Sequence, residues 1–141
     1  LADEAKKVGA LFVTCITELT SLAILKPPAN FGSDIVVGEG QSLGIPISYG
    51  GPYLGFMAVK QDLLKKLPGR IVGLTTDDRG NEGFVLTFRA REQDIRRERA
   101  TSNITTNQAL LALSATIYLA AMGRDGLINV AKASYKQAHI L

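Results

Sequence analysis

The stretch from Gly38 to Gly55 most constrains the fold, because it contains six glycines and two prolines within eighteen residues. It follows the apolar segment 34–37 (DIVV), which is typical of a short buried strand. Glycine permits backbone conformations with positive φ, whereas proline fixes φ and removes a hydrogen-bond donor. The composition therefore predicts a tightly turning loop at the end of a strand, and it excludes a regular helix there.

The flanking segments predict an α/β fold. Short apolar strands are expected at residues 10–16 and 54–60, and residues 71–88 have the pattern of a hairpin. Helical segments are expected at residues 3–9, at 61–69, from 105–107 to Gly123, and at 126–141. Alternation of helix and short apolar strand indicates a largely parallel sheet covered on both faces. Ligands usually bind at the carboxyl ends of such strands, where the glycine-rich stretch lies.

Composition narrows the classes of function. The 141 residues carry a net charge of +3 without a long run of like charge, so neither a nucleic-acid arm nor a membrane patch is indicated. The longest apolar tract, Ala109 to Met122, is short for a bilayer span and predicts a buried helix. A single cysteine, Cys15, and a single histidine, His139, exclude an internal disulfide and a Cys/His metal cluster. We expect Cys15 to be buried in its strand, and the chain, which starts at a helix end without methionine, to be a fragment of a longer protein.

Residues 40–44 (GQSLG) match the G-x-S-x-G pattern of a hydrolase nucleophile elbow, with His139 downstream. The elbow needs a helix directly after the serine, and Gly44 and Pro46 disfavour one after Ser42. A loop whose backbone N–H groups bind a phosphate is an alternative, although no established phosphate-loop pattern is present. A structural turn is the simplest interpretation.

A run of hydroxyl and amide side chains precedes the helix that ends at Gly123. Its members are Thr101, Ser102, Asn103, Thr105, Thr106 and Asn107. Capping a helix needs only two or three such residues, so the surplus is consistent with hydrogen bonding to an anion. The five arginines between Arg89 and Arg99 could bind carboxylates or phosphates, but ion pairs such as Glu92 with Arg96 are the more common role.

Four segments together resemble one known family. They are residues 32–56 (GSDIVVGEGQSLGIPISYGGPYLGF), 67–73 (LPGRIVG), 83–110 (GFVLTFRAREQDIRRERATSNITTNQAL) and 117–123 (IYLAAMG). In this order they resemble the P-protein of the glycine cleavage system, glycine dehydrogenase (decarboxylating), in its subunit 1 form, over essentially the whole chain. Asp94, Arg99 and Thr105 stand where the family commonly has histidine, lysine and cysteine. These three positions are therefore poor candidates for essential chemistry.

The resemblance implies a pyridoxal-phosphate enzyme fold of the aspartate-aminotransferase type (fold type I), with a mostly parallel sheet flanked by helices. Residues 1–106 would be the second half of the major domain, and residues 107–141 would be helices that lead to a small C-terminal domain. Only the second of the family's two homologous halves or subunits carries the cofactor lysine. Aligning Ile45-Pro46 with the same dipeptide of that half places Gln41 at the Schiff-base lysine position. A primary amide cannot form a Schiff base, so no catalytic residue is expected in this chain.

The implied role is to complete an active site across a subunit interface. The residues expected to contact the partner's cofactor phosphate are Thr101, Ser102, Asn103, Thr105 and Thr106. The assembled enzyme would decarboxylate glycine with pyridoxal phosphate and pass the aminomethyl group to the lipoyl arm of H-protein. Its partners would be the lysine-bearing subunit 2 and lipoylated H-protein, in the cytoplasm or, in a eukaryote, the mitochondrial matrix. The isolated chain is expected to be inactive. The alternative is a non-catalytic scaffold or interaction module of the same fold.

Overall fold

A computed structural model describes residues 1–88, 90, 92–100, 102 and 108–140. They form two compact units, which are described separately. The first contains Leu1–Lys60 together with Gln108–Leu141, and the second contains Gln61–Asn107. The domain boundary expected from the family resemblance, between residues 106 and 107, stays a prediction.

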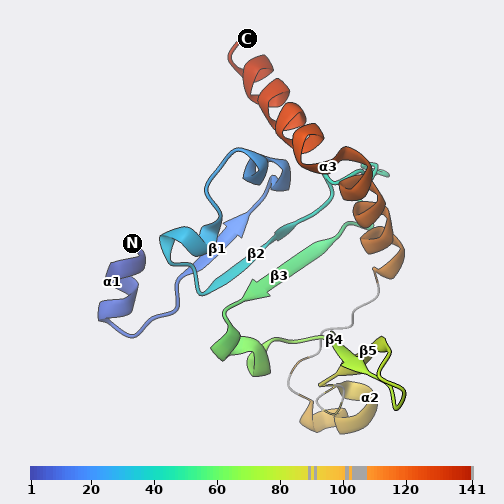
Figure 1. Cartoon of the computed structure of the whole chain (residues 1–141). Coiled ribbons are helices and arrows are strands. Elements are labelled where there is room, and N and C mark those ends of the chain that lie inside the picture. Colours follow the sequence, from blue (N-terminus) through green and yellow to red (C-terminus); the bar gives the residue numbers. More distant parts are fainter. Residues whose placement is uncertain (89, 91, 101, 103–107, 141) are drawn as a thin grey trace. The chain divides into compact units, whose positions relative to one another are not determined.

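The first unit contains a three-stranded sheet. Its strands are β1 (Val13–Ile16), β2 (Ile35–Glu39) and β3 (Gly55–Val59), hydrogen-bonded in that order (Figure 1). β1 and β2 are parallel, whereas β2 and β3 are antiparallel. The expected largely parallel sheet is therefore not confirmed in this chain. A loop without a crossover connects β2 to β3, and such a loop can only return the next strand in the opposite direction.

Shorter elements surround this sheet. They are α1 (Ala2–Lys7), η1 (Leu19–Ala23) and η2 (Pro28–Phe31). The end of α1 agrees with the sequence, because Gly9 follows it with a φ of +72°. The strands predicted at residues 10–16 and 34–37 are both present, although β1 starts three residues later than predicted and β2 extends two residues further.

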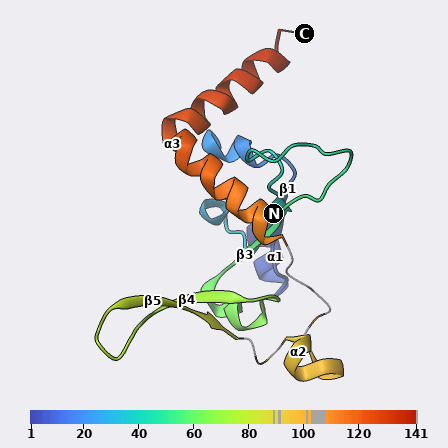
Figure 2. The same ribbon diagram turned by 90° about the vertical axis from the view of Figure 1, so that its right-hand side faces the viewer.

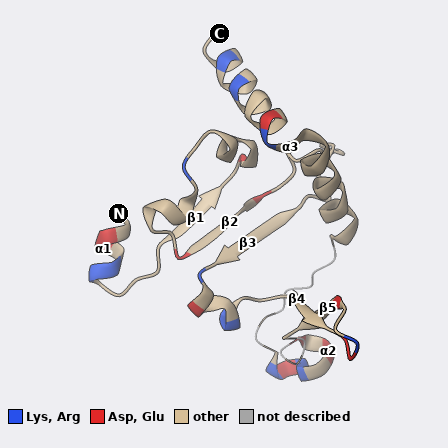
Figure 3. Cartoon of the chain, viewed as in Figure 1, with Lys and Arg blue, Asp and Glu red and all other residues tan. Residues whose placement is uncertain are grey.

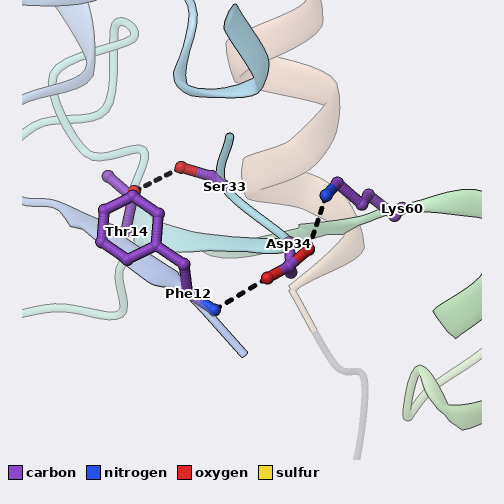
Figure 4. A network of polar contacts seen from close by, with 5 residues as sticks. All are labelled: Phe12, Thr14, Ser33, Asp34 and Lys60. Atoms are coloured by element: carbon purple, nitrogen blue, oxygen red, sulfur yellow. Dashed lines mark hydrogen bonds and ion pairs between the residues drawn. The ribbon is translucent and has the colours of Figure 1, made fainter. Parts of the chain in front are cut away.

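Asp34 fixes the start of β2 against both neighbouring strands (Figure 4). Its Oδ2 accepts a hydrogen bond from Phe12 N at 2.8 Å, and its Oδ1 accepts one from Lys60 Nζ at 2.5 Å. Thr14 Oγ1 and the buried Ser33 Oγ share a further hydrogen bond of 2.6 Å beside it. The Lys60 ammonium and then the Phe12 N–H lower the pKa of the Asp34 carboxyl below its ordinary value of 3.8.

The longest element, α3 (Ala109–Ala138), bends at Gly123, where φ is 57° and ψ is −172° (Figure 2). The predicted end of one helix at Gly123 and the start of a second are thereby confirmed. By length and composition alone α3 could cross a membrane, and 6% of its most apolar window is buried. The part of α3 before the bend, residues 109–122, contains no charged side chain (Figure 3).

The expectation that this helix is buried is wrong for this chain. Leu110, Leu113 and Ile117 are 71%, 55% and 60% exposed, and only Ala115 and Ala131 are buried. The physical reason is that η1 and the glycine-rich loop cover one side of α3, which leaves a second apolar side uncovered.

The second unit contains the predicted hairpin, formed by β4 (Ile71–Thr76) and β5 (Glu82–Thr87). Asp77 organises its turn, because Oδ1 accepts hydrogen bonds from Arg79 N at 2.9 Å and from Asn81 N at 2.8 Å. These bonds are typical of an aspartate that stabilises a turn through nearby backbone donors.

The remaining elements of this unit are short. They are η3 (Gln61–Lys66), α2 (Gln93–Arg96) and η5 (Arg97–Arg99). The brief helix expected at residues 61–69 is thus a 3₁₀ helix that ends at Lys66. Arg96 Nε donates to the carbonyl of Ala90 at 3.2 Å, which is a different contact from the expected ion pair with Glu92.

Candidate functional site at the loop between β2 and β3

The loop Gly40–Leu54 has a narrow neck, where residues 39–41 approach Leu54, and one carboxylate closes this neck. Gly40 N donates to the carbonyl of Leu54 at 2.7 Å. Glu39 Oε1 accepts hydrogen bonds from Gln41 N at 3.0 Å and from Leu54 N at 2.8 Å. A single oxygen of Glu39 therefore joins the outgoing and the returning limb of the loop.

Gln41 uses its side chain within its own loop. Its Nε2 donates to the carbonyl of Ile45 at 2.5 Å, and its own carbonyl accepts from Ile45 N at 3.1 Å. Residues 27–59 contain no lysine, and the amide of Gln41 is not an amine. The residues of this loop therefore do not fit a covalently held pyridoxal phosphate.

The base of the loop packs on α3. Gly44 has a φ of +79°, and a Cβ atom added there would lie 2.8 Å from Cδ2 of Tyr118. Leu43 and Ile45, on either side of this glycine, are 7% and 6% exposed. Gly44 is thus required both for its backbone conformation and for the close approach of the loop to the helix.

The tip of the loop projects away from this packed base. Residues 48–51 all have positive φ, including the two non-glycine residues Ser48 at 41° and Tyr49 at 55°. The carbonyl of Ile47 accepts hydrogen bonds from Gly50 N at 2.9 Å and from Tyr53 Oη at 3.0 Å. Ile47 is 72% exposed and Tyr49 is fully exposed. The tip is therefore closed on itself and presents two apolar side chains to solvent.

The geometry of a hydrolase elbow is absent from the described residues around Ser42. The chain turns after β2 without entering a helix. Ser42 Oγ is buried and makes no hydrogen bond. The pKa of the Glu18 carboxyl is lowered, mainly by a hydrogen bond from the Thr20 hydroxyl and to a smaller extent by the Ser42 hydroxyl. His139 Nδ1 pairs with the carbonyl of Tyr135 at 2.8 Å. The prediction that no helix directly follows Ser42 is confirmed.

The structure does not test the predicted contacts to a cofactor phosphate. Most of the run of hydroxyl and amide side chains lies outside the described residues, namely Thr101, Asn103, Thr105, Thr106 and Asn107. Ser102 is described and is half-buried. The role of this segment stays a prediction.

A hollow lies beside β1, apart from the loop between β2 and β3. It has a volume of about 510 Å³, and its lining includes Cys15, Leu22, Leu25 and Phe31. Cys15 is exposed there, so the expectation of a buried cysteine is wrong. Within the described part of the chain, no group of three or more His, Cys, Asp or Glu side chains could hold a metal ion.

The described geometry defines a class: an α/β chain with a glycine-rich loop at a strand end, which carries an amide and no lysine. The family is shown directly, because all 141 residues match the model of the family described as "Glycine cleavage system P-protein". The chain belongs to this family.

Individual relatives of this chain have names that agree with this family assignment. The chain is 61% identical over 132 residues to "Probable glycine dehydrogenase (decarboxylating) subunit 1" of Desulforamulus reducens, covering 94% of this chain and 29% of that protein. It is 52% identical over its whole length to the protein of the same name from Chlorobaculum parvum, covering 32% of that protein. The chain thus spans about a third of the length of these curated relatives.

A solved structure has the same fold as this chain. It is a crystal structure of glycine decarboxylase (P-protein) of the glycine cleavage system in inhibitor-bound form. The two match with a TM-score of 0.92 and 52% identity over 98% of this chain and 31% of that one.

Sequence reasoning missed Glu39 as a residue that organises the loop. The available signal was a carboxylate at the end of an apolar strand, directly before the glycine-rich stretch. Such a side chain can reach backbone N–H groups on both limbs of a strand-end loop.

Proposed function

We propose that the protein containing this chain acts as subunit 1 of glycine dehydrogenase (decarboxylating) and completes an active site with a lysine-bearing partner. The observation that carries this proposal is that the Gln41 side-chain amide donates to Ile45 O, at the position that the family resemblance assigns to the Schiff-base lysine. The relatives named subunit 1 support the same role. The assembled enzyme would decarboxylate glycine and pass the aminomethyl group to the lipoyl arm of H-protein.

Pyridoxal phosphate, held covalently by the partner, would supply the electron sink for decarboxylation. We further propose a fold of the aspartate-aminotransferase type, with a mostly parallel sheet in the complete domain. The parallel pairing of β1 with β2, and a glycine-rich loop at the carboxyl end of β2, support this fold. The free thiol of Cys15 is consistent with a cytoplasmic, reducing location.

The segment from Thr101 to Thr106 is proposed to contact the partner's cofactor phosphate. In the sequence this segment precedes α3, and the N-terminal end of a helix favours anions. In the complete subunit, alanine at Thr101, Ser102 and Asn103 together should weaken cofactor retention by the assembled enzyme. A matched triple alanine variant at Thr14, Thr75 and Thr76 should not. Unchanged cofactor affinity and activity in the first variant would refute this contact.

A non-catalytic scaffold is the second candidate. The observation that favours it is that the Gln41 side chain, which is not an amine, donates a hydrogen bond within its own loop. Titrating the complete subunit into its lysine-bearing partner separates the two functions. Glycine-dependent CO₂ exchange that rises to a stoichiometric plateau supports the enzyme, and exchange equal to that of the partner alone supports the scaffold.

A further inference from the structure

Glu39, the last residue of β2, also holds the two limbs of the following loop together. Glu39 pairs with Gly55 in the ladder, and the Gly40 N to Leu54 O bond already continues that ladder by one residue. Beyond this point the two limbs diverge, and the next backbone donors are Gln41 N and Leu54 N. Glu39 Oε1 accepts from both, at 3.0 and 2.8 Å. The half-buried carboxylate thus joins the two limbs of the loop at the point where the ladder of backbone hydrogen bonds ends.

The loop above this neck has a conformation that needs such support. Ser48 and Tyr49 have positive φ values of 41° and 55°, which cost free energy for residues with a Cβ atom. The tip is held internally by the carbonyl of Ile47 and has its large side chains in solvent. Its direction therefore depends on the neck and on the packed base at Gly44.

We propose that Glu39 is a positioning residue for this loop. Its carboxylate fixes the backbone at residue 41, the position of the cofactor lysine in the family's catalytic half, and sets the direction of the tip that carries Tyr49. The importance of this positioning for activity rests on the proposed function. We call the two hydrogen bonds from Gln41 N and Leu54 N to Glu39 Oε1 the clamp. The clamp is observed independently of any activity, so its effect on the loop and its effect on activity can be tested separately.

The first experiment follows cleavage by chymotrypsin after Tyr49 in the complete subunit, with cleavage after the half-buried Phe56 on β3 as the marker of global unfolding. Glu39→Ala should increase cleavage after Tyr49 about tenfold relative to cleavage after Phe56, because two hydrogen bonds to an ionised group are lost. Glu39→Gln keeps an oxygen acceptor at the same place and should restore slow cleavage to within about threefold.

Asp34→Ala is the matched control, since Asp34 also accepts two hydrogen bonds but at the opposite end of β2. It should not raise the ratio of Tyr49 to Phe56 cleavage. An unchanged ratio in Glu39→Ala would overturn the clamp, and so would an equal increase in Glu39→Gln, because that result would show that the acceptor oxygen does not matter.

The second experiment measures glycine-dependent CO₂ exchange with the lysine-bearing partner. Glu39→Ala should lower kcat about tenfold with a smaller change in KM for glycine, and Glu39→Gln should recover most of the loss. If cleavage responds as expected but kcat does not, the clamp stands and its role in the reaction is overturned. If the unaltered subunit adds nothing to its partner, the proposed function fails while the cleavage result is unaffected.

Discussion

Replacing Gly44 with alanine tests the packing of the loop on α3. In the folded protein Gly44 has a φ of +79°, and an added Cβ would lie 2.8 Å from Tyr118 Cδ2 and 2.9 Å from Tyr118 Cβ and Cγ. Carbon atoms make favourable contacts at about 3.5–4.0 Å, so the loop or the ring must move. Gly44→Ala therefore combines a backbone penalty with a steric one.

The two contributions can be estimated separately. A left-handed conformation costs a residue with a Cβ about 1–2 kcal/mol. Forcing an extra methyl group into a packed contact costs about 1–3 kcal/mol. We expect Gly44→Ala to lower the free energy of unfolding by roughly 2–4 kcal/mol, because relaxation of Tyr118 offsets part of the sum.

The assay is urea unfolding followed by circular dichroism, with Gly9→Ala as the matched control. Gly9 also has a left-handed conformation, with a φ of +72°, but apart from residues 8–10 no atom of the described residues lies within 4 Å of its added Cβ. Gly9→Ala should therefore lose only about 1–2 kcal/mol. The reasoning fails if the two variants lose the same stability, because the contact with Tyr118 would then contribute nothing.

Three further predictions follow from single contacts. Gly38→Ala should destabilise the protein by about 3 kcal/mol in the same assay, because its Cβ would clash with the carbonyl of Ile16 and lie 2.7 Å from the Phe56 ring; a loss below about 1 kcal/mol would contradict this. Gln41→Leu should cost about 1–2 kcal/mol, because it leaves the carbonyl of the buried Ile45 without its side-chain donor; equal stability of variant and parent would be the contrary result. The lowered pKa of Asp34 means that its contribution to stability is complete above its ordinary value of 3.8 and is lost as the pH falls through the lower folded value. Asp34→Asn should therefore flatten the decline of the urea midpoint below about pH 4, and an unaltered slope would argue against the Lys60 contact.

Local features of the fold could be predicted from the sequence. Gly123 marks the bend in α3, because glycine readily adopts the positive φ that ends a helix. The hairpin in the second unit follows from two apolar segments around a turn that contains Asp77 and Gly80. The glycine-rich loop lies where expected, directly after β2.

Features that depend on contacts between residues far apart in the sequence could not be predicted. The apolar character of residues 54–60 predicts a strand but not its direction. The antiparallel direction of β3 follows from its connection to β2, which contains no crossover helix. Burial of Cys15 and of α3 was overestimated, because apolar character does not say which segment covers a side chain. The clamp formed by Glu39 joins residues 15 positions apart, so it depends on the path of the whole loop.

We propose that this chain belongs to a subunit that contributes to glycine decarboxylation without a cofactor lysine of its own. The most direct test is the exchange of labelled CO₂ into glycine, measured for the complete subunit alone, for its lysine-bearing partner alone and for the two together. We expect no exchange by the subunit alone and exchange well above that of the partner when both are present. Exchange by the subunit alone, or no gain on mixing, would contradict it.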